Sequence, residues 1–195
     1  MADRLNGFFS PLLRRWRFAA VQRFIKAGEV LDYGCGIGLL AKFIPAERYI
    51  GLDIDNPSLE RARQGFPAHR FLHLSEFLPD KEYDTLISLA VIQYIPDPEQ
   101  FLGWALGLLR PGGKIVITTP NPALERLLLV GGRLGLLGRD SREEHVTLLD
   151  KSGFGALANK LGISLTEYST FLLGANQLAV YQSLVKRQLT QETEA

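Results

Sequence analysis

Short, mainly apolar runs recur along the chain and are separated by segments of mixed polarity. Runs that end at turn-forming or acidic residues predict buried strands, here at residues 29–32, 49–53, 70–74, 83–89 and 114–119. Ahead of the first run, apolar residues at helical spacing between arginines predict an amphipathic helix over residues 11–25. Strands that alternate with helices are typical of a parallel sheet covered on both faces. Right-handed connections then favour a doubly wound α/β fold.

Caps and prolines mark the helix boundaries within this pattern. Asn56 is predicted to cap a helix whose first residue is Pro57. The segment Asp97-Pro98-Glu99-Gln100 opens another helix, which is predicted to run to Leu109 and to stop at the following Pro-Gly-Gly turn. Pro45 is predicted to end the helix that follows the first strand.

The pattern changes after Pro120. A short helix is predicted from Asn121 to residue 129, and residues 130–138 are apolar but interrupted by four glycines. A helix is then predicted over residues 150–161. Two further strands follow, at 164–172 and 177–184, and the Gly-Ala-Asn turn between them predicts an antiparallel hairpin. We therefore expect a mostly parallel sheet with an antiparallel hairpin at one edge.

Composition and charge narrow the classes of function. A chain of 195 residues fits one domain over residues 1–195, with a flexible polar tail at 188–195. The formal net charge of +1 gives no electrostatic basis for nucleic acid as the main partner. One cysteine cannot form an internal disulfide, which fits a reducing, cytoplasmic compartment. The first residues do not resemble a signal peptide, and no apolar run is long enough to span a bilayer.

The most specific motif follows the first predicted strand. There, an apolar run ends in Asp32 and leads into glycines at alternate positions, Gly34, Gly36 and Gly38, with Cys35 between the first two. Glycines at such positions allow a tight turn and a close approach of the backbone to a ligand. In the dinucleotide-binding pattern the third glycine lies three positions after the second, so this spacing differs from it. The motif resembles the first motif of class I S-adenosylmethionine-dependent methyltransferases, and the likeness extends over nearly the whole chain.

This resemblance implies a Rossmann-like methyltransferase fold with seven strands, the last of them antiparallel. It also implies S-adenosylmethionine as the cofactor and S-adenosylhomocysteine as the product. Gly34, Cys35, Gly36 and Gly38 are expected to bring backbone N–H groups and bare Cα atoms against the methionine and ribose parts, with Cys35 a packed residue and not a reactive thiol. Asp32 is expected to attract the ammonium group. Alternatively, its carboxylate hydrogen-bonds its own loop.

The second predicted strand ends in Asp53, which lies 19 residues after Gly34. A carboxylate at that distance can accept hydrogen bonds from two ribose hydroxyls, and the resemblance places the ribose-binding acid at the same position. Asp55 is the alternative, although it is better suited to supporting the next helix start. Ile54 is expected to supply the apolar surface on which the adenine ring lies.

Residues after the third and fourth predicted strands complete the expected cofactor site. Ser75 and Glu76 are the candidates for the adenine edge, because the family often has an acidic residue where this chain has Leu74 or Ser75. The backbone of Leu89 and Ala90 is expected to meet the methionine end. Gln93 and Tyr94 stand where the family often has histidines and are expected to face the reacting methyl group, with packing as the alternative for Tyr94.

Methyl transfer from a sulfonium requires little covalent help, because orienting two reactants can supply up to roughly 7–11 kcal/mol. A general base is needed only where the acceptor keeps its proton. His145 is the candidate, since it lies where the family builds its acceptor pocket, and a solvated loop histidine is the alternative. His69 and His73 are expected to be structural, and no metal site is predicted.

Two segments are expected to cover the cofactor: an N-terminal helical cap at residues 1–27 and an apolar lid at residues 121–149. Their apolar side chains, Trp16 among them, favour a small and largely apolar acceptor molecule. They also allow weak peripheral contact with a membrane, whereas simple packing on the core is the plainer interpretation of the lid. Arg14 or Arg17 could meet the cofactor carboxylate, or else remain solvated.

The leading hypothesis is S-adenosylmethionine-dependent methyl transfer to a small, largely apolar acceptor. One alternative is an NAD-dependent oxidoreductase, which the glycine spacing disfavours. The other is a protein that binds S-adenosylmethionine without catalysis. The sequence leaves the acceptor, the methylated atom and the oligomeric state open.

Overall fold

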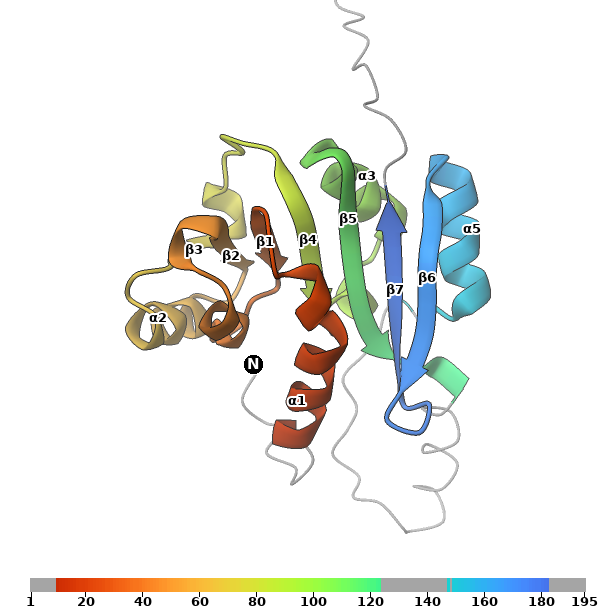
Figure 1. Ribbon diagram of the computed structural model, residues 1–195, viewed down its shortest axis with the longest axis horizontal. Coiled ribbons are helices and arrows are strands. Elements are labelled where there is room, and N and C mark those ends of the chain that lie inside the picture. The colour runs from red at the N-terminus through yellow and green to blue at the C-terminus, as the bar shows by residue number, and fades with distance from the viewer. Residues whose placement is uncertain (1–9, 124–146, 148, 183–195) are drawn as a thin grey trace, which may run out of the picture.

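The structure, a computed structural model, describes residues 10–123, 147 and 149–182, whose helices surround one seven-stranded sheet (Figure 1). The strand order is β3-β2-β1-β4-β5-β7-β6. The first five are parallel, and β7 is antiparallel to both of its neighbours. The predicted doubly wound fold with an antiparallel hairpin is therefore confirmed. The strands are β1 (Val30–Tyr33), β2 (Tyr49–Asp53), β3 (Arg70–His73), β4 (Tyr83–Leu89), β5 (Leu109–Pro120), β6 (Ser164–Phe171) and β7 (Asn176–Gln182).

Two apolar clusters hold helices against opposite faces of this sheet. On one face, α3 and α5 bury Leu102 and Phe154 against Leu86 and Ile115. The other face is covered by α1, by α2 and by short 3₁₀ turns, and Figure 1 shows α1 in front of the sheet with α3 and α5 behind it. The α-helices are α1 (Ser10–Val21), α2 (Asn56–Gly65), α3 (Pro98–Gly107) and α5 (Lys151–Leu161). The 3₁₀ turns are η1 (Gln22–Phe24), η2 (Leu39–Phe43), η3 (Ala46–Arg48), η4 (Leu74–Glu76) and η5 (Ile92–Tyr94).

Several predicted helices differ from those observed. The segment after the glycine loop is the five-residue 3₁₀ turn η2 and not an α-helix. It starts from Gly38 in the left-handed region and ends at Ile44, whose extended backbone is the conformation favoured before a proline. The N-terminal helix α1 gives way to η1 after Val21, four residues before the predicted end at residue 25.

Cap geometry corrects two further boundaries. Asp55, and not Asn56, caps α2, because its Oδ2 accepts the Ser58 N–H at 3.0 Å. Asp97 caps α3 as predicted. However, α3 ends at Gly107, and β5 already begins at Leu109, where it pairs with Tyr83. The Pro-Gly-Gly turn therefore lies within the irregular start of β5 and does not precede that strand.

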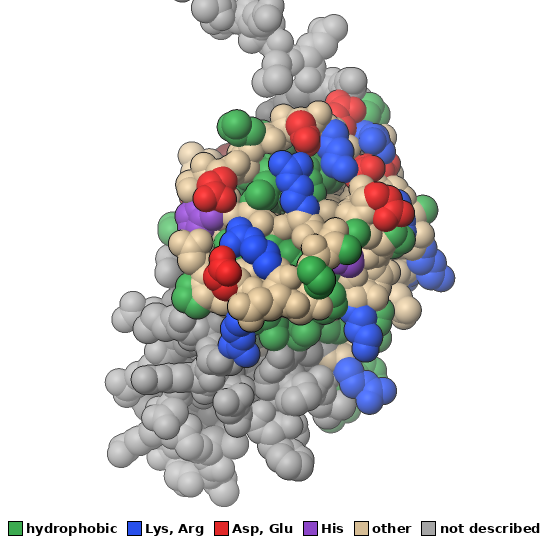
Figure 2. All heavy atoms as spheres, turned by 90° about the vertical axis from the view of Figure 1, so that its left-hand side faces the viewer, with side chains coloured by type: hydrophobic (Ala, Val, Ile, Leu, Met, Phe, Trp, Pro, Cys, Tyr) green, Lys and Arg blue, Asp and Glu red, His purple; other side chains and the backbone are tan. Residues whose placement is uncertain are grey.

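The surface at the β3 edge carries mixed charges, and side-chain hydrogen bonds join α1 to β7. Figure 2, which faces the β3 edge, shows acidic and basic side chains interspersed without a large patch of one sign. Among the described residues, no helix is long and apolar enough to cross a membrane. On the α1 face, the Arg17 guanidinium donates to Asn176 Oδ1 at 3.0 and 3.1 Å, which ties α1 to the start of β7.

Candidate functional site

Most of the predicted cofactor residues lie at one edge of the sheet, where the parallel strands end. Strand β1 lies between β2 and β4, so the order in which strands join the sheet reverses there. Ligands of open α/β sheets bind outside the carboxyl ends of the strands at such a reversal. The glycine loop after β1, Asp53 at the end of β2, and Leu89 at the end of β4 all lie at this edge.

Hydrogen bonds within the protein occupy the N–H groups of the glycine loop. Gly34 and Cys35 both donate to the Leu52 carbonyl, at 2.8 and 2.9 Å, and Gly38 donates to the Cys35 carbonyl at 3.0 Å. Gly36 donates to Asp53 Oδ2 at 2.7 Å. Each of these N–H groups therefore has an acceptor within the protein, and the contact of the loop with the methionine and ribose parts stays a prediction.

The three glycines of the loop meet different surroundings, although all have positive φ. A Cβ atom on Gly34 would lie 2.3 Å from Val91 Cγ2, and one on Gly38 would lie 2.6 Å from the Phe71 ring. A Cβ atom on Gly36 would meet nothing within 4 Å. Packing thus explains two of the glycines, whereas Gly36 exposes bare backbone to open space, as close approach of a ligand requires.

Asp53 links the glycine loop to the end of β2 through both carboxylate oxygens. Oδ1 accepts the N–H groups of Ile54 and Asp55, at 2.8 and 2.9 Å, and Oδ2 accepts that of Gly36. A carboxylate offers about four acceptor positions, so one position, on Oδ2, is left. Asp53 can therefore accept one further hydroxyl in this geometry, whereas two hydroxyls would require release of the Gly36 N–H.

Asp32 is buried, with 3% of its surface exposed, and accepts a 2.7 Å hydrogen bond from the Tyr49 hydroxyl. The hydrogen bond joins Asp32 to β2 and not to its own loop. Burial raises the pKa of its carboxyl to about 7, the Tyr49 hydrogen bond opposes this shift, and the nearby Asp53 charge adds to it. The carboxyl is therefore poised between its two protonation states near neutral pH.

Tyr49 was not recognised from the sequence, although one signal was present. Gly51 pairs in register with Asp32, and a Cβ atom on it would lie 2.9 Å from both the Tyr49 hydroxyl and Cys35 Sγ. A glycine inside a strand often marks the close approach of another group. Here the missing side chain leaves room for the Tyr49 hydroxyl to reach the carboxylate.

Cys35 packs against the apolar cluster on the α1 face. Burial raises the pKa of its thiol far above the ordinary value, and the charges of Asp32 and Asp53 raise it further. The thiolate is therefore disfavoured, which agrees with the expectation of a packed residue and not a nucleophile.

The residues expected near adenine lie beside the end of β3. Ile54 is exposed over 72% of its surface, so it offers an apolar face to solvent. His73 Nδ1 accepts the Ser75 N–H at 3.2 Å and lies 2.6 Å from Ser75 Oγ, while Nε2 lies 3.2 Å from the Ile54 carbonyl oxygen. Ser75 and Glu76 both belong to η4. His73 thus has the structural role expected of it, as the residue that joins η4 to Ile54.

His69 is also structural. Its Nε2 lies 2.8 Å from the Ile44 carbonyl oxygen, and its ring packs edge-on against Tyr49 and Phe66. Within the described ranges, no group of three or more His, Cys, Asp or Glu side chains is placed to hold a metal ion.

The turn after β4 (residues 89–94) contains a strained residue. Ala90 has φ +57°, and its N–H donates to the Thr118 carbonyl at 2.7 Å. Gln93 Nε2 donates to the Ala90 carbonyl at 2.9 Å, and Gln93 Oε1 accepts from Thr119 Oγ1 at 3.0 Å. Gln93 is 3% exposed, so the expectation that it faces the reacting methyl group is wrong: its amide holds the turn.

Tyr94 is 41% exposed, in contrast to its buried neighbour Gln93. Its expected place at the substrate stays a prediction. His145, the candidate base, and nearly all of the predicted lid lie outside the described residues. Of that segment, Asn121 Oδ1 accepts the Ala123 N–H at 3.0 Å, as expected at a helix start, and Thr147 donates through its N–H and hydroxyl to Gln93 and Ile95 carbonyls.

Comparison with known proteins places this site in a family. A family model described as a methyltransferase domain matches residues 6–168. The chain belongs to this methyltransferase family. Membership argues against the NAD-dependent alternative, and it agrees with the cofactor that the glycine motif predicted, because related proteins are S-adenosylmethionine-dependent.

Individual relatives match about half of this methyltransferase. A probable S-adenosylmethionine-dependent methyltransferase of Mycolicibacterium smegmatis is 38% identical over 98 residues, which cover 48% of this chain and 38% of the relative. Trans-aconitate 2-methyltransferase of Variovorax paradoxus is 33% identical over 103 residues, or 49% of this chain and 40% of that protein. The chain thus spans well under half the length of these two relatives.

A solved structure extends the likeness of the fold across the methyltransferase. The crystal structure of an S-adenosylmethionine-dependent methyltransferase from Mesorhizobium loti aligns with a TM-score of 0.67 and covers 88% of this chain and 100% of that one. The identity is 17%, so this match establishes a shared fold and nothing about the acceptor.

Proposed function

We propose that this methyltransferase binds S-adenosylmethionine over Gly36, between the ends of β1, β2 and β4, and transfers its methyl group to a small, largely apolar acceptor. One observation carries the proposal. At the point where strand order reverses, the Cα of Gly36 faces open space beside a carboxylate that retains one acceptor position.

The chemical groups at this edge fit the parts of the cofactor. Asp53 Oδ2 suits one ribose hydroxyl, and exposed Ile54 suits the face of the adenine ring. Asp32 is a negative charge in a low-dielectric site once ionised, which favours an ammonium nearby. In this arrangement Ser75 or Glu76 contacts the adenine edge, and the backbone around Leu89 and Ala90 contacts the methionine end.

When bound, S-adenosylmethionine supplies an electrophilic methyl group on a sulfonium. The residues of the chain bind and orient. Gly36 permits close approach, Asp53 fixes the ribose, and the Ala90 turn shapes the wall at the methionine end. Orientation of this kind can account for most of the acceleration of an in-line displacement. The proposal includes His145 as the base that removes a proton from the acceptor. This role applies only to acceptors that are protonated at neutral pH.

The apolar acceptor is inferred from side chains near the same edge. Trp16 on α1 is 48% exposed, Tyr94 is 41% exposed, and Leu173 in the β6–β7 turn is fully exposed. Figure 1 shows α1 and the β6–β7 turn at the end of the sheet where β5 finishes. Large apolar groups that face solvent beside a cofactor site favour an apolar ligand.

A ligand-and-variant cycle tests the cofactor assignment. S-adenosylhomocysteine and its 2′-deoxy and 3′-deoxy ribose analogues are titrated calorimetrically into the wild-type protein and into Asp53→Ala. If Asp53 accepts one hydroxyl, one deoxy analogue binds wild type about 3- to 10-fold more weakly than the parent ligand does. The same analogue and the parent then bind Asp53→Ala with equal affinity. An equal penalty in both proteins would remove the ribose assignment.

Turnover with defined acceptors tests the reaction. Tritium transfer from labelled S-adenosylmethionine is measured with a panel of phenols and prenylated phenols, with trans-aconitate, and with a protein–RNA extract. Transfer to the apolar panel alone supports the proposal. Transfer mainly to trans-aconitate or to macromolecules contradicts the acceptor class. Tight binding of S-adenosylmethionine with no transfer to any acceptor favours the non-catalytic alternative.

A further inference from the structure

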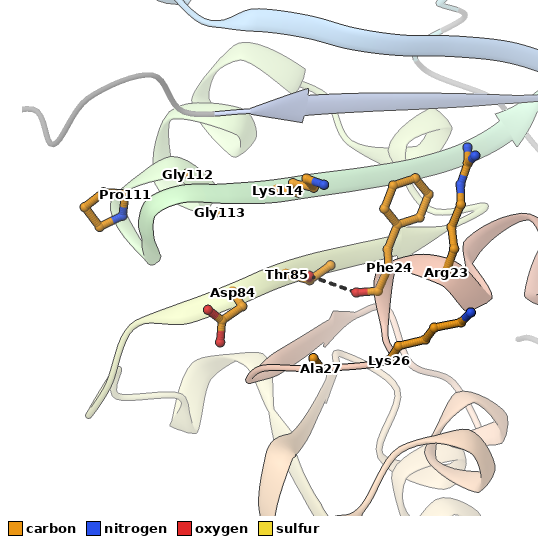
Figure 3. A pocket seen from close by; sticks show the side chains of 10 residues that line it. All are labelled: Arg23, Phe24, Lys26, Ala27, Asp84, Thr85, Pro111, Gly112, Gly113 and Lys114. Carbon is orange, nitrogen blue, oxygen red and sulfur yellow. Dashed lines mark hydrogen bonds between the residues drawn. The ribbon is translucent and has the colours of Figure 1, made fainter.

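A second candidate site lies at the opposite edge of the sheet, where β4 and β5 begin. A groove of about 300 Å³ is lined there by residues of three segments (Figure 3). The segment around η1 contributes Arg23, Phe24, Lys26 and Ala27, the start of β4 contributes Asp84 and Thr85, and the start of β5 contributes residues 111–114. Since the groove lies at the amino ends of these strands, it is separate from the cofactor edge.

The charges in this groove are unbalanced. Three cations, Arg23, Lys26 and Lys114, line the groove together with one carboxylate, Asp84, which leaves a net charge of +2. Asp84 is already engaged, because its Oδ2 accepts from Arg110 Nη1 at 2.6 Å and from the Glu29 N–H at 2.7 Å. It therefore neutralises Arg110 and contributes little to the lysines.

Two of the three lining cations lie near one aromatic ring. Arg23 Cζ lies 4.7 Å, and Lys114 Nζ 5.7 Å, from the centre of the Phe24 ring. Arg23 also pairs with Glu167, whereas Lys26 and Lys114 have no acidic partner in the part of the chain that the structure describes. Two like charges on one ring repel each other, and an anion in the groove would offset that repulsion.

The polar groups of the groove also indicate which ligand it would take. The Phe24 carbonyl already accepts from Thr85 Oγ1 at 3.1 Å, and the Gly112 carbonyl accepts from Gln182 Nε2 at 3.0 Å. Among the lining side chains, the Lys26 and Lys114 head groups are therefore the main groups left to bind a ligand, and both are donors. A phosphate suits them better than a carboxylate, because its oxygens can accept from several cations at once.

We propose that this groove binds a phosphate group, held by Lys26 and Lys114 with support from Arg23. The phosphate belongs either to a free small molecule or to a phospholipid headgroup, and the chemistry at the groove is the same for both. The proposal is independent of the cofactor site, which lies at the other edge of the sheet.

Titration with pyrophosphate at low ionic strength tests the proposal. We expect pyrophosphate to bind the wild-type protein, and the Lys26→Gln/Lys114→Gln double variant to bind it at least about tenfold more weakly. The control is Lys151→Gln, compared with each single variant, because it removes one charge from a lysine that is also 5.7 Å from an aromatic ring, that of Tyr168, on α5. The control is expected to bind like wild type.

A vesicle arm separates the two sources of phosphate. Sedimentation with phosphatidylcholine vesicles, with and without phosphatidylglycerol, is compared for the same proteins. Lysine-dependent binding of pyrophosphate alone indicates a small molecule, and lysine-dependent binding of the anionic vesicles indicates a headgroup. If neither binds, if the double variant binds as wild type does, or if S-adenosylhomocysteine displaces pyrophosphate, the proposal is wrong. The single variants and a urea melt without ligand show whether the double variant is folded.

Discussion

The loops after β1 and after β4 lie at the same edge of the sheet, yet they hold their backbones in different ways. After β1, the positive φ angles fall on glycines, at Gly34, Gly36 and Gly38. After β4, a positive φ falls on Ala90, and hydrogen bonds from Gln93 and to Thr118 hold it there. In the first loop the glycines themselves permit the positive φ angles, whereas Ala90 is held by a side chain three residues later and by a backbone carbonyl of β5.

This difference has a consequence for what each loop can tolerate. Substitutions in the glycine loop should act through steric overlap, because of its three glycines only Gly36 has room for a side chain. Substitution in the β4 turn should act through lost hydrogen bonds, because a left-handed alanine costs on the order of 1 kcal/mol or more and needs support.

The largest expected effect follows Gly36→Val. A branched side chain there would fill the open space over the loop, so we expect loss of measurable S-adenosylhomocysteine binding, more than about 1,000-fold or roughly 4 kcal/mol. The matched control is Gly162→Val at the end of α5, where φ is +62° and the space is equally open. Both variants should lose similar stability in urea melts. Normal cofactor binding by Gly36→Val would show that the loop is structural only.

The next effect is a pH dependence that begins at Asp32. Its pKa is raised from 3.8 to about 7 in the folded state, so the folded protein holds a proton that the unfolded chain has lost. The resulting stabilisation is fully present below about pH 4 and is lost as pH rises through about 7. The free energy of unfolding falls over this range by up to about 4 kcal/mol. Asp32→Asn keeps an acceptor for Tyr49 but cannot ionise. The unfolding free energy of wild type should therefore fall relative to Asp32→Asn between pH 4 and 7, and parallel curves would contradict this.

The glycine loop was predictable from the sequence because its requirement is local. Three glycines after an acid in a strand suffice to place the loop, and Asp53 followed from its distance along the chain. What was not predictable is how those groups use their hydrogen bonds. The N–H of Gly36 goes to Asp53 only because β1 and β2 are adjacent, which is a property of the assembled sheet.

The β4 turn shows the opposite case, because no local pattern marks it. In the sequence, Gln93 is a polar residue next to the expected site. Only the folded structure shows that its amide is hydrogen-bonded to the Ala90 carbonyl and to the Thr119 hydroxyl. The helix expected between the glycine loop and Pro45 is likewise a 3₁₀ turn, η2, bounded by left-handed Gly38 and extended Ile44. The parallel sheet and the terminal hairpin were predictable, because they follow from the alternation of strands with helices and from turn residues.

A third prediction concerns the support of the β4 turn. Gln93→Leu keeps the volume of the side chain but leaves the Ala90 carbonyl and the Thr119 hydroxyl without their partner. We expect a loss of about 1–3 kcal/mol in the free energy of unfolding and weaker cofactor binding. Gln100→Leu, on the exposed side of α3, is the control and should change stability by less than about 0.5 kcal/mol. Equal effects in the two variants would show that Gln93 does not hold the turn.

The smallest expected effect comes from giving the β4 turn a glycine of its own. Ala90→Gly removes the cost of a left-handed alanine but adds freedom to the unfolded chain, and each contribution is on the order of 1 kcal/mol. The two should nearly cancel, so the free energy of unfolding should stay within about 0.5 kcal/mol of wild type. The reverse exchange in the glycine loop, Gly38→Ala, places a Cβ atom 2.6 Å from the Phe71 ring. It should therefore lower the free energy of unfolding several times more than Ala90→Gly changes it.

Combining Ala90→Gly with Gln93→Leu isolates the role of Gln93. If its amide mainly holds the strained alanine, glycine at position 90 reduces the loss caused by Gln93→Leu, and a fully additive double variant would show that the amide serves only its own burial.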